Sequence, residues 1–468
     1  MKVEQLYTKC LAQGAYYLES EGVAAVIDPL RETDPYLQMA KEDGAAIKYI
    51  FLTHFHADFV SGQVDLAKKT GATIVFGPGA KTEYSIHEGK DNEVFELGKL
   101  RIQLLHTPGH TLESSSYLLL DEEGKEHAVF TGDTLFIGDV GRPDLAVKQG
   151  TLTEEDLAKH LYHSLRNRIM TLSDDVIVYP AHGAGSACGK NMSKETFDSI
   201  GNQKKTNYAL RADMTEQEFV DAVLDGLSAP PQYFPLNVMM NKTENLDIDK
   251  IMERGSTPLS YTDFMAFKED GALVLDVRHQ KDFTEEHIPG SIFIGLNGQF
   301  APWVGALIKD INQKIVLLVP EGKEEEAAMR LARIGYDNSR GYLAGGIETW
   351  KSKGNPTESI SVQNNAVLEK ALVDENAQVI DVRKPGEYNS SHITDVENRP
   401  LDLNIDSVYE WDKDKTYYIH CAGGYRSVIF ESILKSKGIH NVIDIAGGYG
   451  AIKVNPNISH CENVCENS

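Results

Sequence analysis

Short apolar runs alternate with amphipathic stretches along the first half of the chain. Apolar runs of four to eight residues are typical of buried strands, and apolar residues three and four apart are typical of helices. The pattern predicts strands at residues 24–27, 47–52, 73–76, 100–105, 116–120, 128–131 and 176–179. It also predicts a helix at residues 61–69 that stops at Gly71. This alternation indicates a layered α/β domain over residues 1–240.

The second half of the chain contains an internal repeat. The runs LVLDVR and VIDVR correspond, as do FTEEHI and YNSSHI, and LAGGI and IAGGY. In each copy a second apolar run, at residues 315–319 and again at 417–420, precedes a loop and a predicted helix. The repeat therefore predicts two copies of one α/β domain.

These copies set the predicted domain boundaries. The two repeated domains are expected at residues 257–355 and 360–456. Three prolines near residue 230 and the polar segment 241–256 mark the exit from the first domain. Residues 457–468 are polar and are predicted to form a flexible tail.

Histidines and carboxylates follow several predicted strands of the first domain. Open α/β sheets bind ligands at the carboxyl ends of their strands, and imidazole with carboxylate is a typical ligand set for a transition metal. Any one of these histidines taken alone is more simply a solvated loop residue. The prediction depends on separate loops meeting at one centre, and the side chains concerned are His54, His56, Asp58, His110, Asp133 and His182.

The sequence motifs around these residues resemble the metallo-β-lactamase superfamily. They are THFHADFVSG, TPGHT, FTGDTLF and GRPD. Within it the motifs look most like persulfide dioxygenases, with glyoxalase II-type thioesterases as the nearest other relatives. The resemblance implies an αββα sandwich and one Fe(II) per chain, held by His54, His110 and Asp133. It implies a supporting role for His56, Asp58 and His182. Two histidines and one carboxylate leave open positions for dioxygen and a substrate sulfur.

Phe59 stands where two-metal relatives in this superfamily have a further histidine. Phenylalanine cannot bind a metal, so Asp58 and His182 alone supply too few ligands to hold a second ion well. The sequence therefore favours one iron. A dinuclear zinc thioesterase with the same fold and a non-enzymatic sulfur-relay protein are the alternatives.

Two further residues are candidates near this centre. Arg142, in Gly-Arg-Pro-Asp, resembles a family arginine that helps hold the thiol carrier of the persulfide, and a structural ion pair is the alternative. Cys188 lies six residues after His182 and is a candidate persulfide relay, with a buried inert thiol as the alternative. The chain lacks the tyrosine that glutathione-using relatives place after that histidine, so the identity of the thiol carrier stays open.

In the second repeat, Cys421 opens the loop CAGGYRS before a helix predicted at residues 428–437. Inward N–H groups at a helix N-terminus, with Arg426 close by, stabilise a thiolate or persulfide anion. The Cys-x4-Arg spacing with the DVR and GG motifs resembles rhodanese sulfurtransferases, whereas the phosphatase loop is one residue longer. The resemblance implies catalytic roles for Cys421 and Arg426 and substrate binding by Gly423, Gly424, Tyr425 and Ser427.

The first repeat has PEGKEEE in the equivalent loop and no cysteine there. The carboxylates would repel a persulfide anion, so we expect this repeat to be catalytically inactive. In the tail, Cys461 and Cys465 form a Cys-x3-Cys pair without matching histidines, which favours adventitious oxidation over zinc binding.

Composition narrows the class of partner. The net charge of -24 and the pI near 5.0 argue against nucleic acid and anionic membranes. Five scattered cysteines are a poor disulfide framework, and no apolar run approaches the roughly 20 residues of a membrane span. We therefore expect a cytoplasmic protein, and the resemblance implies a homo-oligomer.

Taken together, the sequence predicts coupled chemistry on sulfur. The resemblance implies that the first domain oxidises a low-molecular-weight thiol persulfide with O2 to sulfite. Cys421 would take sulfane sulfur from a second persulfide and transfer it to sulfite, giving thiosulfate. Placing both modules in one chain raises the local concentration of the shared intermediate.

Overall fold

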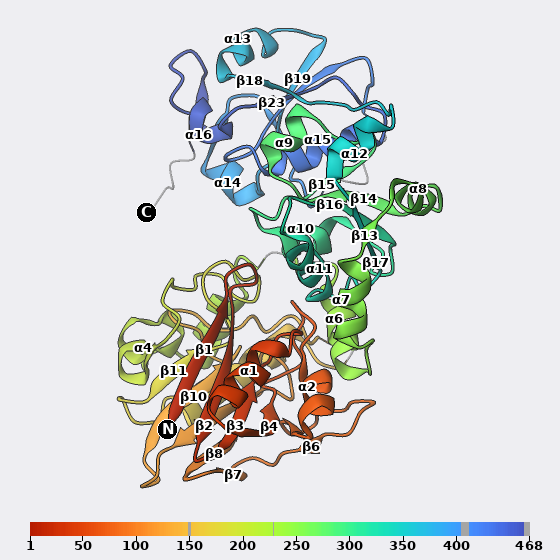
Figure 1. The fold of residues 1–468 in the computed structure, drawn as a ribbon. Coiled ribbons are helices and arrows are strands. Elements are labelled where there is room, and N and C mark those ends of the chain that lie inside the picture. Colours follow the sequence, from red (N-terminus) through yellow and green to blue (C-terminus); the bar gives the residue numbers. More distant parts are fainter. Residues whose placement is uncertain (148–150, 228, 404–410, 463–468) are drawn as a thin grey trace. The chain divides into compact units, whose positions relative to one another are not determined.

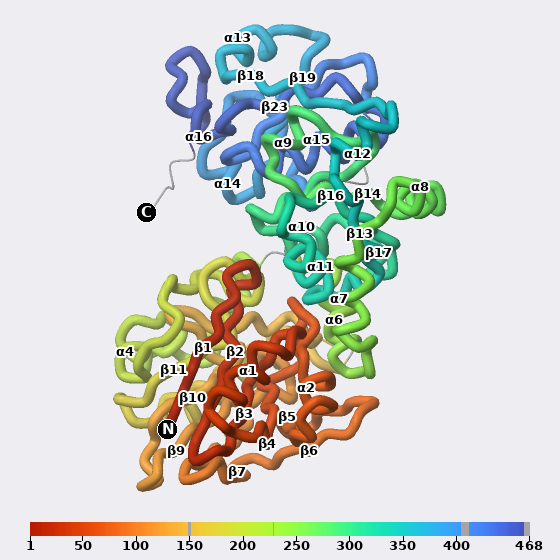
Figure 2. Tube along the Cα trace, viewed as in Figure 1, coloured from red at the N-terminus to blue at the C-terminus, as the bar shows by residue number. Residues whose placement is uncertain are grey.

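The structure is a computed structural model that describes residues 1–147, 151–227, 229–403 and 411–462. Its secondary structure is shown in Figure 1 and its Cα trace in Figure 2. The chain divides into two compact units, Met1–Lys250 with Ala332–Gly335, and Ile251–Leu331 with Tyr336–Ser468. Each unit is described by itself below.

The N-terminal domain contains two six-stranded sheets. The first has the order β1 (Lys2–Thr8), β2 (Gln13–Ser20), β3 (Val23–Ile27), β4 (Ala46–Phe51), β5 (Thr73–Phe76) and β6 (His87–Glu88). The second has the order β12 (Asp198–Ser199), β11 (Ile177–Pro180), β10 (Glu126–Gly132), β9 (Ser115–Leu120), β8 (Leu100–His106) and β7 (Val94–Leu97). Strands β3 to β6 are parallel, and β7 to β10 are antiparallel.

The two sheets pack face to face through an aromatic core. The Phe51 ring lies 4.7 Å from the Tyr117 ring and 5.2 Å from the Phe95 ring. Successive residues of β3 point to opposite faces, so Ala25 and Ile27 join this core while Ala24 and Val26 join the outer one. Both faces are apolar because both are covered, which explains the uninterrupted apolar runs in the sequence.

Helices cover the outer face of each sheet. Helices α1 (Asp34–Glu42) and α2 (Gln63–Thr70) pack on the first sheet through Tyr36, Ala40 and Leu66. Helices α3 (Glu154–Ser164) and α5 (Glu216–Leu224) pack on the second through Leu161, Phe219 and Val220. The layers are therefore helix, sheet, sheet, helix, and the predicted αββα sandwich is confirmed.

Most predicted elements occur within a residue or two of their expected bounds. Helix α2 ends where Gly71 adopts φ 75°, as the glycine predicted. Strands β1 and β2 were not predicted, because their polar and tyrosine-rich sequence lacks a clear apolar run. The segment 241–256, predicted to mark the exit from the first domain, contains the boundary between the two units at Lys250 and Ile251. It also completes α6 (Phe234–Lys242) and forms α7 (Ile248–Gly255), whose Ile248 and Ile251 are buried.

The two repeats have the same parallel five-stranded topology. The first sheet has the order β13 (Pro258–Leu259), β17 (Ser339–Leu343), β16 (Ile315–Leu318), β14 (Leu273–Asp276) and β15 (Ile292–Phe293). The second has the corresponding order β18 (Ser361–Gln363), β23 (Val442–Ile445), β22 (Thr416–His420), β19 (Ala377–Asp381) and β21 (Glu397–Asn398). The internal repeat in the sequence is therefore a repeat of structure.

Helices surround both of these sheets. Those of the first repeat are α8 (Tyr261–Glu269), α9 (Gln280–Glu285), α10 (Phe300–Leu307), α11 (Glu324–Ala332) and α12 (Gly346–Ser352). Those of the second are α13 (Leu368–Ala371), α14 (Pro385–Ser390), α15 (Arg426–Ser436) and α16 (Gly448–Ile452). Helix α15 confirms the helix predicted after the cysteine loop.

The repeated DVR motif forms the same ion pair twice. Arg278 Nη2 lies 2.6 Å from Asp276 Oδ2 and also donates to a carbonyl eight residues later in the chain. Arg383 Nη2 lies 2.7 Å from Asp381 Oδ2 and also donates to a carbonyl eight residues later. The motif thus joins the end of a strand to the next segment in both copies, with or without a cysteine.

The segment predicted as a flexible tail is ordered in part. Strand β24 (His460–Glu462) pairs with β20 (Ser391–Ile393), and Ile458 is buried. The second repeat therefore extends at least to Glu462. Cys465 lies outside the described residues.

Phe51→Ala should lower the free energy of unfolding of the N-terminal domain by about 3–5 kcal/mol, because it leaves a cavity among three aromatic rings. All three tryptophans, at positions 303, 350 and 411, lie in the repeats, so their fluorescence reports on unit 2. Circular dichroism should show an earlier transition while the tryptophan transition stays in place.

Leu317→Ala is the matched control, because this buried side chain belongs to the first repeat. It should move the tryptophan transition to lower temperature. An equal shift of the tryptophan signal in both variants would contradict separate cores for the two units.

Candidate metal centre and cysteine loop

Three side chains from separate loops meet at the carboxyl ends of the strands in the N-terminal domain. His54 follows β4, His110 follows β8, and Asp133 follows β10. Their potential ligand atoms lie within 4.8 Å of one another, and all three residues are buried. Asp133 Oδ2 lies 3.4 Å from His110 Nε2 and 3.8 Å from His54 Nε2. The structure thus brings together the three predicted ligands.

Outer hydrogen bonds set the tautomers of these histidines. His110 Nδ1 lies 2.8 Å from the carbonyl oxygen of Arg142, which can only accept, so Nδ1 carries the proton. His54 Nδ1 lies 2.9 Å from Thr53 Oγ1, whose own proton goes to Asp28 Oδ2 at 2.8 Å. Both Nε2 atoms therefore present a lone pair to the centre, as metal-binding imidazoles do.

Asp133 supplies the charge that such a site requires. It is buried, and neither of its carboxylate oxygens meets hydrogen-bond geometry with a described residue. A buried carboxylate without a partner is strongly disfavoured. Burial also lowers the pKa of His54, with the neighbouring histidines adding to the effect, so His54 is neutral. The donor set therefore fits a divalent cation.

Two glycines allow the backbone to approach the centre. Gly132 has φ 54°, and a Cβ there would lie 2.5 Å from the Thr53 side chain. A Cβ on Gly141 would overlap the carbonyl oxygen of Asp133. Any larger residue would displace the loops that position Thr53 and Asp133.

A second group lies beside the first. His56, Asp58 and His182 also have potential ligand atoms within 4.8 Å of one another, and His182 Nε2 lies 3.5 Å from Asp58 Oδ2. It lies 3.7 Å from Asp133 Oδ1, so Asp133 stands between the two groups. His182 Nδ1 lies 3.3 Å from the carbonyl oxygen of Ala12, which leaves its Nε2 facing inward.

Phe59 limits the number of ligands in this second group. Its side chain is fully buried, and its ring lies 4.3 Å from the His56 ring at an interplanar angle of 30°. It thus occupies the edge of the group without supplying a ligand atom. His56 Nε2 lies 3.1 Å from Asp28 Oδ1, and the carboxylates of Asp28, Asp58 and Asp133 outweigh burial and raise the pKa of His56. The negative charge of Asp28 therefore attracts the His56 imidazole.

Asp28 and Asn241 hold the metal loop and were not predicted. Asp28 accepts from Thr53 N at 2.8 Å, and it follows strand β3 in the same way as the ligands follow theirs. Asn241 Nδ2 donates to the carbonyl oxygens of His56 and Phe59, each at 2.8 Å. Asn241 lies more than 180 residues along the chain from this loop, so no local sequence signal points to it.

Arg142 is buried and forms an ion pair. Its Nε and Nη2 atoms donate to the two oxygens of Asp144 at 2.7 and 2.6 Å, and Nη1 donates to Ala187 O at 3.3 Å. These contacts are those of a structural ion pair, the alternative given for Arg142 above. The carbonyl oxygen of Arg142 also orients His110. Binding of a substrate by Arg142 stays a prediction.

Cys188 borders the metal centre. It is buried, and its Sγ lies within 4.8 Å of ligand atoms of Asp133 and His182. Burial raises the pKa of the Cys188 thiol well above its usual value, and the charges of Asp58 and Asp133 add to this effect. The thiol is therefore protonated in the metal-free protein, and a persulfide-relay role stays a prediction.

In the second repeat, backbone and hydroxyl donors surround the sulfur of Cys421. Gly424 N donates to Sγ at 3.1 Å, and Ser427 Oγ lies 3.6 Å from Sγ. Gly424 has φ 95°, which favours glycine, and so the loop can turn its amide inward. Cys421 is buried, while Gly423 is exposed. This arrangement stabilises negative charge on sulfur.

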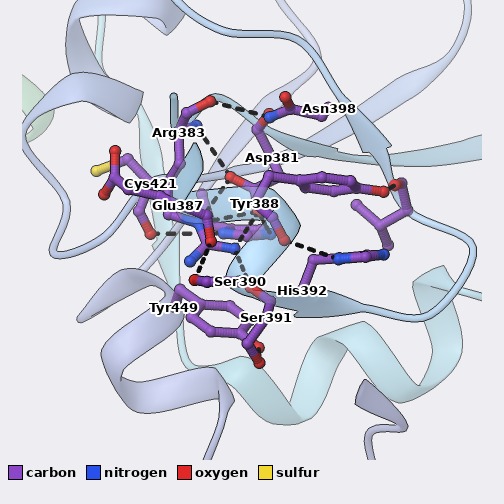
Figure 3. Close-up of polar contacts among 12 residues, drawn as sticks. Asp381, Arg383, Glu387, Tyr388, Ser390, Ser391, His392, Asn398, Cys421 and Tyr449 are labelled. Atoms are coloured by element: carbon purple, nitrogen blue, oxygen red, sulfur yellow. Dashed lines mark hydrogen bonds and ion pairs between the residues drawn. The ribbon is translucent and has the colours of Figure 1, made fainter. Parts of the chain in front are cut away.

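Arg426 forms a forked ion pair with Glu387. Its Nη1 and Nη2 atoms lie 2.6 and 2.8 Å from the two carboxylate oxygens, and Arg426 lowers the pKa of Glu387. Figure 3 shows Glu387 near Cys421 and the Asp381–Arg383 pair. Arg426 is thus fixed at the loop through Glu387, and its catalytic role stays a prediction.

Two buried carboxyls lie close to this loop. Burial raises the pKa of Glu431, in α15, well above its usual value, and the charges of Asp444 and Cys421 add to the effect. Burial also raises the pKa of Asp444, in β23, to about 6. Glu431 is therefore protonated at neutral pH and does not repel an anion on Cys421.

Tyr425 contacts the first repeat, and its predicted role in substrate binding stays a prediction. Its hydroxyl donates to the carbonyl oxygen of Gly295 at 2.6 Å. The loop of the first repeat, residues 320–326, has no sulfur nucleophile, and Glu324 begins helix α11 there.

In β24, Cys461 Sγ lies 3.5 Å from Thr394 Oγ1.

Comparison with known families identifies the domains that contain these residues. The metallo-β-lactamase superfamily matches residues 9–182, and the rhodanese-like domain matches residues 260–353 and 364–455. None of the helices in the part of the chain that the structure describes has the length and apolarity to cross a membrane.

Three similar proteins are informative. A probable hydroxyacylglutathione hydrolase of Schizosaccharomyces pombe is 32% identical over 34% of this chain and 59% of its own length. The mitochondrial persulfide dioxygenase ETHE1 of Homo sapiens is 33% identical over 34% of this chain and 58% of its own length. The chain thus spans less than two thirds of the length of either protein.

The third is a solved metallo-β-lactamase structure from Staphylococcus aureus subsp. aureus COL. It is 31% identical, and the match covers 73% of this chain and 98% of that one, with a TM-score of 0.64. With the αββα sandwich and the repeated parallel sheets, these findings establish the family. The chain belongs to the metallo-β-lactamase superfamily and carries two rhodanese-like domains after its metal-binding domain.

Proposed function

We propose that the chain is a non-heme iron persulfide dioxygenase coupled to a sulfurtransferase. The observation that carries the proposal is the buried set of two histidines and one carboxylate, with Phe59 in place of a further ligand, in the same chain as a rhodanese loop that contains Cys421. Fe(II) held by His54, His110 and Asp133 would supply electrons and open coordination positions for dioxygen and a substrate sulfur.

The residues of the first site would hold and orient the reactants. The Nε2 lone pairs of His54 and His110 and the charge of Asp133 define one side of the centre, and outer hydrogen bonds keep them there. The overall reaction would convert RSSH, O2 and H2O into RSH, SO3²⁻ and two protons. The buried surroundings would exclude bulk water from the site.

Cys421 would carry out the second reaction. Its thiolate attacks the sulfane sulfur of a second RSSH, forms a new S–S bond and releases RS⁻. Sulfite then attacks the terminal sulfur, which gives S2O3²⁻, regenerates the thiolate and releases the persulfide proton, which converts RS⁻ to RSH. The Gly424 N–H and the Ser427 hydroxyl stabilise the charge on sulfur in both steps.

A dinuclear zinc thioesterase is the second candidate. The group formed by His56, Asp58 and His182 favours it, because three potential ligands lie within 4.8 Å of one another. A hydroxyacylglutathione hydrolase among the similar proteins points the same way. Metal analysis separates the candidates, since one iron per chain supports the dioxygenase and two zinc ions support the hydrolase.

His110→Ala should lower iron affinity by more than about 100-fold and abolish oxygen uptake, because it removes one of three ligands. Iron content per chain and oxygen consumption on glutathione persulfide are the measurements. His106→Ala is the control, since His106 Nε2 lies 2.9 Å from the carbonyl oxygen of Leu112, outside the ligand group. Full oxygen uptake in His110→Ala would show that the metal lies elsewhere.

Phe59→His should raise the capacity for zinc from one ion per chain to two. The new imidazole would join His56, Asp58 and His182 as a fourth ligand, which is the usual number for zinc. Equilibrium dialysis with zinc and elemental analysis give the stoichiometry. Phe55→His on the same loop, whose native ring packs on Phe76, is the control and should bind one ion. Two zinc ions in the unmodified protein would favour the hydrolase.

Cys421→Ser should leave oxygen uptake intact while the product changes from thiosulfate to sulfite. Serine lacks the nucleophile that carries sulfane sulfur, whereas the metal centre is untouched. Chromatography of labelled thiosulfate and sulfite measures the change. Cys461→Ser, in β24, should form thiosulfate normally. Unchanged thiosulfate output in Cys421→Ser would contradict the role assigned to the loop.

A further inference from the structure

Tyr425 joins the cysteine loop of the second repeat to the first repeat. Its hydroxyl donates to Gly295 O at 2.6 Å, and its ring lies 5.7 Å from the Phe293 ring at 67°. A Cβ on Gly298 would overlap the same ring. Gly298 does not have a positive φ, so its lack of a side chain is a requirement of packing against Tyr425.

Helix α15 continues this contact along one face. Ser432 lies seven residues after Tyr425, two helical turns further on, and its Oγ accepts from Phe293 N at 3.0 Å. Lys435 Nζ lies 3.1 Å from Glu358 Oε2 in the segment that joins the repeats. Glu358 in turn pairs its backbone with His287 of the first repeat. The helix that begins at the cysteine loop is therefore held by the first repeat at several points.

The cysteine loop is held from two sides. At its start, Tyr449 N donates to Cys421 O at 2.7 Å and Gly450 N donates to Ala422 O at 3.1 Å, both from the second repeat. At its far end the loop is held through Tyr425. The amide that donates to the sulfur belongs to Gly424, the residue directly before Tyr425.

We propose that the cysteine-less first repeat is a positioning element for sulfur transfer, and that it acts through Tyr425 to keep the Gly424 amide directed at Cys421 Sγ. This role rests on the proposed sulfurtransferase activity of Cys421. It gives the inactive repeat a function that needs no nucleophile. Tyr425 is a positioning residue rather than a catalytic one.

The geometry makes a specific prediction for a residue far from the cysteine in sequence. Gly298→Ala would push the Tyr425 ring and with it the Gly424 amide, although Gly298 lies in the other repeat. Removing a well-placed donor to a developing anion costs about 10²–10³-fold in rate, so misdirecting one should cost about tenfold in kcat. KM for the sulfur donor should change by less than about twofold, because the displaced amide donates to Cys421 Sγ and acts on the charge that develops there during transfer.

The test uses the full chain with thiosulfate as sulfur donor and cyanide as acceptor. Thiocyanate formation is measured for Gly298→Ala and Tyr425→Phe, with each rate divided by the fraction of Cys421 that reacts with iodoacetamide. Both variants should lose about tenfold in kcat. Tyr417→Phe is the control, since it removes a hydroxyl bond to Asp412 O in the same repeat, away from the loop, and should transfer sulfur normally.

A double-mutant comparison separates positioning from a general loss of folding. On a Tyr425→Ala background, Gly298→Ala should cause no further loss, because the ring that it displaces is absent. Full transfer rates in both single variants while Cys421→Ser is inactive would overturn the positioning role and leave the proposed function standing. An equal loss from Gly298→Ala on both backgrounds would also overturn it. Transfer that survives in Cys421→Ser would overturn both proposals.

Discussion

The buried carboxylate of Asp133 is the constraint on which the N-terminal domain depends. Among the described residues neither oxygen of this carboxylate has a hydrogen-bond partner, so the buried charge requires a counter-charge, and His54 and His110 offer lone pairs rather than protons. The protein meets this requirement only if several loops end at one point. Three features bring the loops together. The two facing sheets place their strand ends side by side, glycines allow the close approaches, and hydrogen-bond acceptors behind the histidines orient the rings.

The outer hydrogen bonds connect this chemistry to the rest of the domain. Asp28 orients His54 through Thr53, and Arg142 orients His110 through its carbonyl oxygen while its guanidinium is held by Asp144. Asn241, more than 180 residues further along the chain, donates to two carbonyl oxygens of the metal loop. Residues that never touch a metal therefore decide where the ligands point.

The repeats separate what maintains the fold from what performs chemistry. The Asp276–Arg278 and Asp381–Arg383 pairs have nearly the same geometry, although one copy has no cysteine. The DVR motif is therefore a structural feature of the domain. Chemistry needs the glycine-rich loop in addition, and in the second repeat that loop is held partly by the first. The first repeat has no cysteine in its loop and contacts the cysteine loop of the second through Tyr425.

The sequence by itself predicted most of the elements, the domain order, the three candidate metal ligands and the cysteine loop. These features are local, since strand and helix periods, terminating glycines and short motifs lie within a few neighbouring residues. Only the tertiary structure decided that Arg142 pairs with Asp144, that Asn241 holds the metal loop, and that the Tyr425 hydroxyl binds Gly295 of the other repeat. The last two contacts join residues more than 100 positions apart, and such partners are chosen by packing, which no local pattern encodes.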